Sequence, residues 1–185
     1  MDKEKIRQAV LLFLEGIGED PKRDGLKDTP GRVSDMCDEI FGGYILDPAE
    51  PLSRVFDSET GDMVVEKDIR FYSVCEHHLL PFFGTVSIGY VPDGKVVGLS
   101  KLARVVDVYA KRAQIQEQMT TDIANAIQKN LKPKGVIVYV KAEHMCMSLR
   151  GVNRPGTTTD TYKTTGVFSE NEELRRLFFS MMRNN

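Results

Sequence analysis

The spacing of apolar residues changes character near Met63, and this change limits the folds that the chain can adopt. Before it, apolar residues recur every three or four positions, which is typical of helices with one buried face. After it, β-branched and aromatic residues come in short runs bounded by Gly and Pro, which is typical of strands. The pattern predicts an α+β fold with a largely antiparallel sheet. Its strands are expected at about 63–74, 82–91, 95–99, 135–148 and 158–168.

The chain before the sheet is expected to form helices. Residues 3–17 carry apolar side chains at helical spacing, and glycines follow that run. Thr29 followed by Pro30 predicts the N-cap and the first residue of a second helix. Gly42-Gly43 would supply the positive φ that commonly closes such a helix.

The segment between these helices and the sheet predicts how the chain is divided. Residues 46–60 are rich in Pro, Asp, Glu and Ser, which is typical of a surface connection. The length of 185 residues favours a single functional domain. Within it we expect an N-terminal helical region over residues 1–60 and a sheet-containing region over residues 61–185.

A long helical stretch separates the third predicted strand from the fourth. Ser100 is a suitable N-cap, and the helical period continues to Leu131, with an expected interruption at Ala113 to Glu117. A last amphipathic helix closes the chain. Its apolar side is formed by Leu174, Leu177, Phe178, Met181 and Met182.

Composition excludes several classes of function. The formal net charge is -2 and charged residues make up 28%, so no bulk attraction to nucleic acid or to acidic membranes is expected. No stretch is apolar for long enough to serve as a signal sequence or a membrane span, which predicts a soluble cytoplasmic protein. The three cysteines are far apart, which favours thiolate or metal chemistry over disulfides, and Cys37 is expected to pack as a small apolar side chain.

All three histidines fall in two short segments that also hold cysteines, Cys75-Glu76-His77-His78 and His144-Met145-Cys146. Zinc favours thiolate and imidazole ligands, and a Cys-x-x-His turn can bring sulfur and nitrogen to one ion. Cys146 is then the expected third ligand. The sequence therefore predicts a Zn²⁺ site formed by Cys75, His78 and Cys146.

The alternative is that these cysteines and histidines are ordinary interior residues, which is their commoner fate. A single Cys-x-x-His is a weak signal, but two clusters that use every histidine favour a metal site. No second pair lies nearby to complete a closed structural site, so the ion is expected to keep an open position for water. Such an ion provides a hydroxide nucleophile, and a neighbouring histidine can shuttle protons near pH 7.

Strand alternation extends this prediction toward an anion. In an extended segment His144, Cys146, Ser148 and Arg150 would share one face. Ser100, Lys101 and Arg104 cluster at the start of a predicted helix expected near this face, where phosphate could bind. Solvated basic residues are nearly as good an interpretation. The spacing also does not decide between a polar pocket and a solvated helix face for Gln114, Gln116 and Glu117.

Five segments, in order along the chain, resemble the GTP cyclohydrolase I family. Together they cover the chain from about residue 16 to Phe168 and are highly specific. They are Gly25-Leu26-Lys27-Asp28-Thr29-Pro30 with Arg32-Val33, Ser73-Val74-Cys75-Glu76-His77-His78-Leu79-Leu80-Pro81-Phe82, Gly98-Leu99-Ser100-Lys101-Leu102-Ala103-Arg104, Gln114-Ile115-Gln116-Glu117, and His144-Met145-Cys146-Met147 through Arg150-Gly151-Val152.

The resemblance implies conversion of GTP and water into 7,8-dihydroneopterin triphosphate and formate, the first step toward folate, biopterin or deazaguanine compounds. It implies a tunnelling fold, in which an antiparallel sheet is backed by two long helices, with residues 61–185 as the catalytic region. It also implies homo-oligomers in which sheets join into rings. Two pentameric rings would stack into a decamer with active sites at subunit interfaces.

The resemblance also assigns roles to single residues. Zinc would be held by Cys75, His78 and Cys146, and water activated by it would attack C8 of guanine. His77 would donate a proton at N7, His144 would assist later proton transfers, and Ser100 would lie near the ribose. Glu117 would read the guanine edge with help from Gln116. The triphosphate would be held by Lys101, Arg104 and Arg150.

Three positions depart from the family pattern. Ser87 replaces a histidine that is common there, Gln118 replaces an arginine after the Gln-Glu pair, and Tyr162 replaces a small hydroxyl residue. These changes could alter phosphate contacts, ring packing or substrate choice. Two alternatives remain: a non-catalytic member that keeps zinc as a binding module, and a nitrile reductase on the same fold, whose nucleophilic cysteine without zinc fits poorly with cysteines beside histidines.

Overall fold

The computed structural model describes residues 1–182, which group into two compact units, Met1–Gly42 and a second unit that begins at Gly43. The first unit holds two helices, α1 (Lys3–Gly16) and α2 (Thr29–Ile40). Asp2 caps α1 by accepting a hydrogen bond from the Lys5 backbone N–H at 3.1 Å. Both helices are confirmed, but the predicted N-cap of α2 is wrong, because Asp28 precedes the first helical residue, Thr29, and makes no side-chain cap hydrogen bond. The functional division at residue 60 stays a prediction.

Helix α2 does not end by the predicted mechanism, a positive φ at Gly42-Gly43. Phe41 closes the helix at φ −117°, and the chain enters the short 3₁₀ helix η1 (Gly42–Ile45) without a positive φ. Gly43 instead lies against the backbone carbonyls of Val108 and Lys111, where a Cβ would collide. Its N–H donates to Lys111 O at 2.9 Å. Close backbone approach, not helix termination, requires glycine here.

The second unit is built on a five-stranded sheet in the order β5-β2-β3-β6-β7, which is antiparallel except for the parallel pair β2 and β5. A separate antiparallel pair, β1 and β4, places a strand in the segment expected to be a surface connection. The predicted α+β class is confirmed. The strands are β1 (Val55–Asp57), β2 (Val64–Cys75), β3 (Pro81–Val91), β4 (Lys95–Val97), β5 (Ala113–Gln114), β6 (Gly135–His144) and β7 (Thr158–Gly166).

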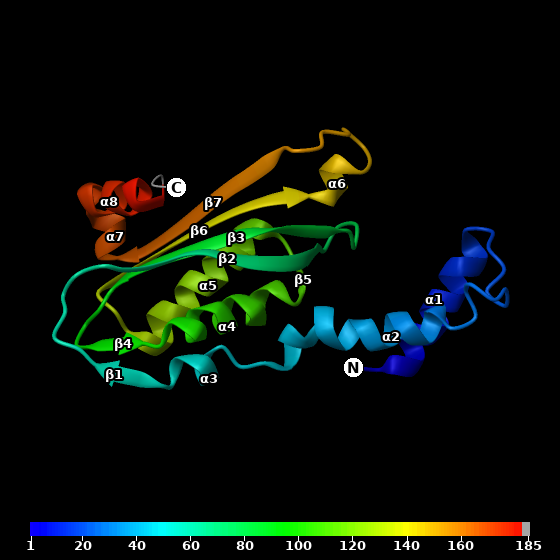
Figure 1. The fold of residues 1–185 in the computed structure, drawn as a ribbon, viewed down its shortest axis with the longest axis horizontal. Helices are drawn as coiled ribbons and strands as arrows, with labels where there is room; N and C mark the ends of the chain where they lie inside the picture. The colour runs from blue at the N-terminus through cyan, green and yellow to red at the C-terminus, as the bar shows by residue number, and fades with distance from the viewer. Residues whose placement is uncertain (183–185) are drawn as a thin grey trace. The chain divides into compact units, whose positions relative to one another are not determined.

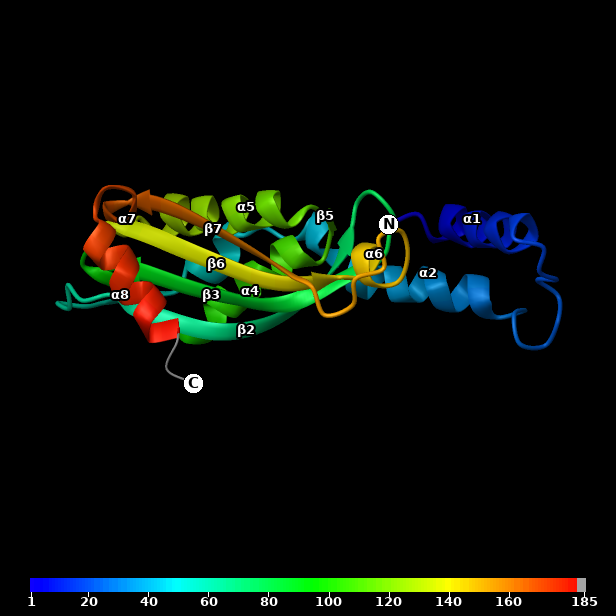
Figure 2. The ribbon, with the colours of Figure 1, turned by 90° about the horizontal axis from the view of Figure 1, so that it is seen from above.

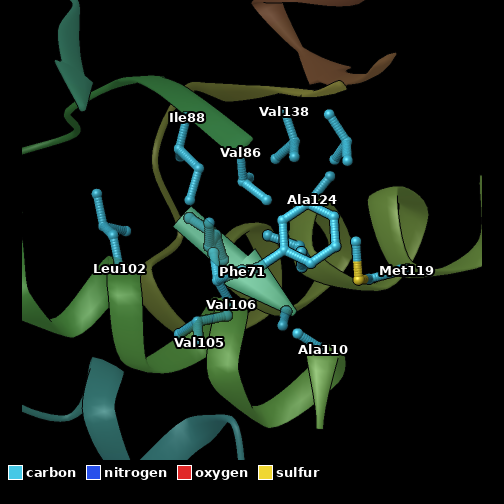
Figure 3. Close-up of a cluster of buried hydrophobic side chains, with 14 of the residues drawn as sticks. Phe71, Val86, Ile88, Leu102, Val105, Val106, Ala110, Met119, Ala124 and Val138 are labelled. Carbon is cyan, nitrogen blue, oxygen red and sulfur yellow. The ribbon is translucent and has the colours of Figure 1, made fainter. Parts of the chain in front are cut away.

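Two long helices cover one face of this sheet (Figure 1). They are α4 (Leu99–Ala110) and α5 (Gln116–Leu131), and the predicted interruption between them is confirmed as β5. Figure 3 shows side chains from both layers in contact, among them Phe71, Val86 and Ile88 from the sheet. Burial of this apolar face holds the helices on the sheet.

Gly98, not Ser100, precedes the first residue of α4, so the predicted N-cap is wrong and Ser100 lies inside the first turn. Ser100 makes no cap hydrogen bond there. Its hydroxyl is on the exposed surface of the helix start.

The opposite face of the sheet carries the C-terminal helix (Figure 2). Phe178 packs there with Phe168, Ile137 and Val91 in a smaller buried cluster. The helices at this point are α7 (Val167–Glu170) and α8 (Glu172–Met182), and two further short ones are α3 (Ala49–Leu52) and α6 (Met145–Ser148). Within residues 1–182, none of the helices combines the length and the apolar character needed to cross a bilayer.

Candidate metal centre and active site

Three strand ends meet at one end of the sheet. β2 ends at Cys75, and Val74 just before it pairs with Pro81, the first residue of β3. Phe82 in turn pairs with His144, the last residue of β6. This register brings the two cysteine–histidine segments together although about 70 residues separate them in the sequence.

A compact turn between β2 and β3 presents the Cys-x-x-His motif. The Cys75 N–H donates to Leu80 O at 2.8 Å, and the Leu79 N–H donates to Cys75 O at 2.9 Å. Leu79 adopts φ +54°, a left-handed conformation that a bulky residue adopts only under such constraint. Cys75 is thereby buried while His77 and His78 reach solvent.

Cys75, His78 and Cys146 offer two sulfur atoms and one ring nitrogen that all lie within 4.8 Å of one another. Tetrahedral zinc with sulfur at about 2.3 Å and nitrogen at about 2.0 Å needs ligand separations of about 3.5 to 3.8 Å. Thiolate and imidazole donors also suit zinc rather than magnesium or calcium. The donor set therefore fits zinc after a shift of about an ångström.

Cys146 reaches this group by a different route from the one predicted. The extended segment was expected to continue to residue 148, but β6 ends at His144 and Met145–Ser148 form α6. The Leu149 N–H donates to Met145 O at 2.9 Å, which closes this turn. The predicted alternation of His144, Cys146, Ser148 and Arg150 on one strand face is wrong, because these residues lack the β-branched side chains that favour strand.

Burial raises the pKa of Cys146, and the neighbouring thiol of Cys75 raises it further. A second thiol nearby disfavours the ionised form of Cys146. A divalent cation between them would reverse this preference, because it stabilises both thiolates.

A pocket of about 210 Å³ is lined by two of the three donors, Cys75 and Cys146. Its wall includes His77, His144 and Glu117, three of the residues predicted to act on the substrate. The full lining is Cys75, His77, Gln114, Ile115, Gln116, Glu117, His144, Cys146, Met147 and Thr159. One chain thus joins the metal donors to two histidines and a carboxylate.

His144 is held rigidly in this wall. Its ring stacks on Phe82 with the centroids 4.6 Å apart and the planes 2° from parallel. Its Nε2 lies 2.8 Å from Oε1 of Gln116. Burial lowers the pKa of His144, and the nearby charge of Glu117 opposes that change only in part.

His77 is held far more loosely. Its Nδ1 lies 3.9 Å from Cys75 Sγ, and its Nε2 lies 3.9 Å from a carboxylate oxygen of Glu76. The side chain is 64% exposed. It can therefore rotate to meet a ligand in the pocket.

Arg150 lies at the exposed rim and contacts His78. Its Nη1 is 2.8 Å from His78 Nε2. A guanidinium can only donate, so this imidazole nitrogen accepts the hydrogen bond. The residue predicted to bind phosphate thus lies next to a metal donor, in the same chain.

The other predicted phosphate residues lie elsewhere. Ser100, Lys101 and Arg104 are in the first half of α4, next to β4 at the end of the sheet opposite α6 (Figure 1). About 14 Å of helix separates Lys101 from Ala110 at the end of α4. The expectation that they lie near the cysteine–histidine segments within one chain is wrong, because α4 begins at the opposite end of the sheet and only its last residues approach Cys75, where β5 follows.

The three departures from the family pattern lie outside the pocket wall. Ser87 accepts a hydrogen bond from the Asp68 N–H at 3.3 Å, where β2 carries a bulge and Asp68 has φ +58°. Gln118 donates to Asp122 on the exposed side of α5 at 2.6 Å. Tyr162 packs against Phe179 of α8. These contacts are structural.

Sequence reasoning missed the residues that hold His144. Phe82 supplies the stacking surface, while Thr120 and Thr161 contact Gln116. The run of threonines in 157–161 was a signal, because hydroxyls on an inward-facing strand position need partners. Only the tertiary pairing of α5 with β7 identifies which hydroxyl is used.

Comparison with known proteins identifies the family of the chain. Residues 6–183 match the family model described as GTP cyclohydrolase I. A GTP cyclohydrolase 1 of Clostridium kluyveri is 51% identical over 183 residues, 99% of each chain. One of Carboxydothermus hydrogenoformans is 56% identical over 170 residues, 91% of this chain and 88% of the relative. Among solved structures, an archaeosine synthase QueF-Like in the apo form matches with a TM-score of 0.47 at 24% identity, over 58% of this chain and 97% of that one. The family model and the full-length relatives show that this chain belongs to the GTP cyclohydrolase I family.

Proposed function

We propose that this protein is a zinc-dependent enzyme that converts GTP and water into 7,8-dihydroneopterin triphosphate and formate. The observation that carries the proposal is the convergence of Cys75, His78 and Cys146, two of which line a pocket together with His77, His144 and Glu117. Its family, whose fold is the tunnelling fold, supplies the reaction. The pocket supplies residues suited to hydrolysis and proton transfer.

Zinc is the cofactor that the donor set favours, held by Cys75, His78 and Cys146. When bound, it would lower the pKa of water and so supply a hydroxide nucleophile near neutral pH. In the proposed reaction C8 of guanine is the carbon attacked, and it leaves as formate.

The two remaining histidines are proposed to move protons. His77 is exposed and loosely held, which suits a group that protonates N7 as the imidazole ring of guanine opens. His144 is held in place by Phe82 and Gln116, and burial lowers its pKa, which suits a base in the later rearrangement of the ribose. Glu117 offers an exposed carboxylate that can accept hydrogen bonds from the guanine edge.

Gln116 was predicted to help read guanine, and that role stays a prediction. Its side chain is only 1% exposed, and its amide is occupied by internal partners. Any contact with guanine would therefore use its backbone.

Ser100, Lys101 and Arg104 are proposed to act on the ribose and triphosphate bound to another copy of the chain, together with Arg150 of that copy. The separation of the two sets of residues within one chain supports this arrangement. The sheet has open edges along most of β2 and along β7, where strands of neighbouring copies can pair. A decamer of two pentameric rings in the cytoplasm is the assembly we propose.

The test is to incubate the purified protein with GTP, measure formate and pterin fluorescence, and determine zinc per chain. We expect about one zinc per chain, turnover, and loss of both in Cys146→Ser. Cys37→Ser is the matched control, because Cys37 is also a buried thiol but lies in the N-terminal unit, and it should retain both. Stoichiometric zinc without turnover would refute the catalytic proposal in favour of a binding module.

A further inference from the structure

Gln116, at the start of α5, is buried beside the imidazole of His144. Its Nε2 lies 2.9 Å from Thr159 O, 3.1 Å from Val140 O and 3.1 Å from Thr161 Oγ1. Its Oε1 lies 2.8 Å from His144 Nε2. The amide therefore connects two strands of the sheet to the histidine.

The orientation of this amide is forced by its neighbours. Backbone carbonyls can only accept hydrogen bonds, so the NH₂ group must face Val140 and Thr159. The reversed orientation would place two oxygen pairs in contact at hydrogen-bond distance, at a large cost in a buried site. Oε1 of Gln116 must then face His144.

The orientation of the Gln116 amide decides which nitrogen of His144 carries a proton. A carbonyl oxygen only accepts, so His144 Nε2 must donate to Gln116. A neutral imidazole carries one proton, and that proton is then on Nε2. The lone pair is therefore on Nδ1, and no described residue forms a hydrogen bond with that atom.

The hydroxyl groups of two threonines complete the hydrogen-bond network around Gln116. Thr120 donates to the Gln116 backbone carbonyl at 2.7 Å, so its own proton is committed. The 2.7 Å contact between the Thr120 and Thr161 hydroxyls must then have Thr161 as donor. A lone pair of Thr161 then remains to accept from Gln116, whose two amide protons are shared among three acceptors, Val140 O, Thr159 O and Thr161 Oγ1.

We propose that Gln116 is a positioning residue that holds His144 in the Nε2–H tautomer, so that Nδ1 is the atom that exchanges protons with the substrate. The stack on Phe82 adds to this by blocking rotation of the ring. The part that concerns substrate rests on the proposed function. The tautomer itself depends only on the contacts of the protein.

The first test is nitrogen NMR of histidine-labelled, zinc-loaded protein without GTP. We expect His144 to show a protonated Nε2, an unprotonated Nδ1, and slow exchange of the Nε2 proton with water. A protonated Nδ1 in the wild type would overturn the proposal. Because no substrate is present, this result is separate from the outcome of the turnover experiment.

The second test compares Gln116→Leu with Gln128→Leu. Gln128 is the matched control, because it is on the same helix and also bonds a β7 threonine, Thr165, but it contacts no histidine. We expect Gln116→Leu to keep zinc, lose the slow Nε2 proton, and lower kcat about 10- to 100-fold with less than a threefold change in KM for GTP. Gln128→Leu should keep the His144 signal. Unchanged tautomer and kcat in Gln116→Leu, or an equal loss in both variants, would overturn the proposal.

If Gln116→Leu folds poorly, a milder pair of variants at Thr161 provides a second test. Thr161→Val removes the hydroxyl that Gln116 and Thr120 share, whereas Thr161→Ser keeps it. We expect faster exchange of the Nε2 proton and a lower kcat in the valine variant and recovery of both in the serine variant. Equal behaviour of the two variants would contradict the role of the network.

Discussion

The two ends of the sheet differ in how their polar side chains are held. At one end, His144 is fixed by buried partners and Cys75 by a tight turn. At the opposite end, Ser100 and Arg104 are exposed, and no ion pair among residues 1–182 involves Lys101 or Arg104. One end is a preformed pocket and the other is a free basic surface.

This difference is what an active site shared between copies requires. The preformed end can bind metal and position a histidine without help. The basic end gains a partner only when a polyanion or another chain is brought to it. Exposed Leu99 at the basic end, and exposed Leu149 and Val152 after α6, are apolar surfaces that an assembly would cover.

The largest expected effect comes from variants that damage one end of the sheet or the other. Cys146→Ser and the double variant Lys101→Ala/Arg104→Ala should each lose more than about 10³-fold of GTP turnover. Co-expression should restore about a quarter of wild-type turnover, because a neighbour can then supply the intact end. Turnover of the mixed oligomer is the measurement.

The matched control for complementation is the pair Cys146→Ser and Cys75→Ser, which damages the same end twice. This pair should not recover turnover in any mixture. Absence of recovery in the first pair would show that both ends act within a single chain. Recovery in the control pair would show instead that Cys75 and Cys146 of one metal site come from different chains.

His144→Ala tests whether the preformed end separates metal binding from proton transfer. We expect full zinc content and a loss of about 10²- to 10⁴-fold in formation of the product, because the base is removed while the metal donors remain. Zinc analysis and pterin fluorescence on one preparation measure both quantities. Loss of zinc in this variant would show that His144 is a zinc ligand. Metal binding and proton transfer would then not be carried out by separate residues.

The fold followed from the sequence wherever burial sets the residue pattern. The helices α1 and α2 and the strands β2 and β3 carry clear periods of burial, and they were predicted within a few residues. Short elements were missed, such as β1 at Val55–Asp57, because three residues carry too little pattern. The end of β6 was placed too late for a similar reason, since α6 is a single turn.

The candidate site likewise has features that the sequence predicts and features that it does not. The grouping of Cys75, His78 and Cys146 was predictable because the two motifs are rich in metal-binding residue types. The position of Lys101 relative to them was not, because the direction in which α4 runs along β2 depends on tertiary packing. The partners of Gln116 were likewise invisible, because pairing of α5 with β7 cannot be read from spacing.

Arg150→Gln probes a smaller effect at the preformed end. His78 Nε2 now accepts a hydrogen bond from Arg150, and a histidine that binds zinc must give a lone pair to the metal and protonate its other nitrogen. The contact with Arg150 must therefore break when metal binds, whichever nitrogen is the ligand. Removing Arg150 should tighten zinc binding about 3- to 10-fold in phosphate-free buffer.

Competition with a chromophoric chelator measures that affinity. Arg154→Gln is the control, because Arg154 is in the same loop but donates only to backbone carbonyls. Weaker zinc binding in the Arg150 variant alone would mean that the arginine supports the metal site instead of competing with it.

The smallest expected effect concerns Glu66, near the opposite end of β2. Its Oε2 is buried without a hydrogen-bond partner among the described residues, and burial raises the pKa of this carboxyl. Because the folded-state pKa lies above the unfolded one, stability is full below the unfolded pKa and falls as pH rises through the folded pKa. Glu66→Gln should therefore raise the free energy of unfolding at pH 7 by about 1 kcal/mol, and by less at pH 4.

Urea midpoints at a fixed protein concentration, at both pH values, measure this difference. Glu59→Gln serves as control, because Glu59 is exposed, and its effect should stay within about 0.5 kcal/mol at either pH. If Glu66→Gln destabilises the protein at pH 7, the carboxylate has a charged partner in the assembled state. Assembly would then fix the side chains at the basic end as well. The difference between the two ends would hold only for the isolated chain.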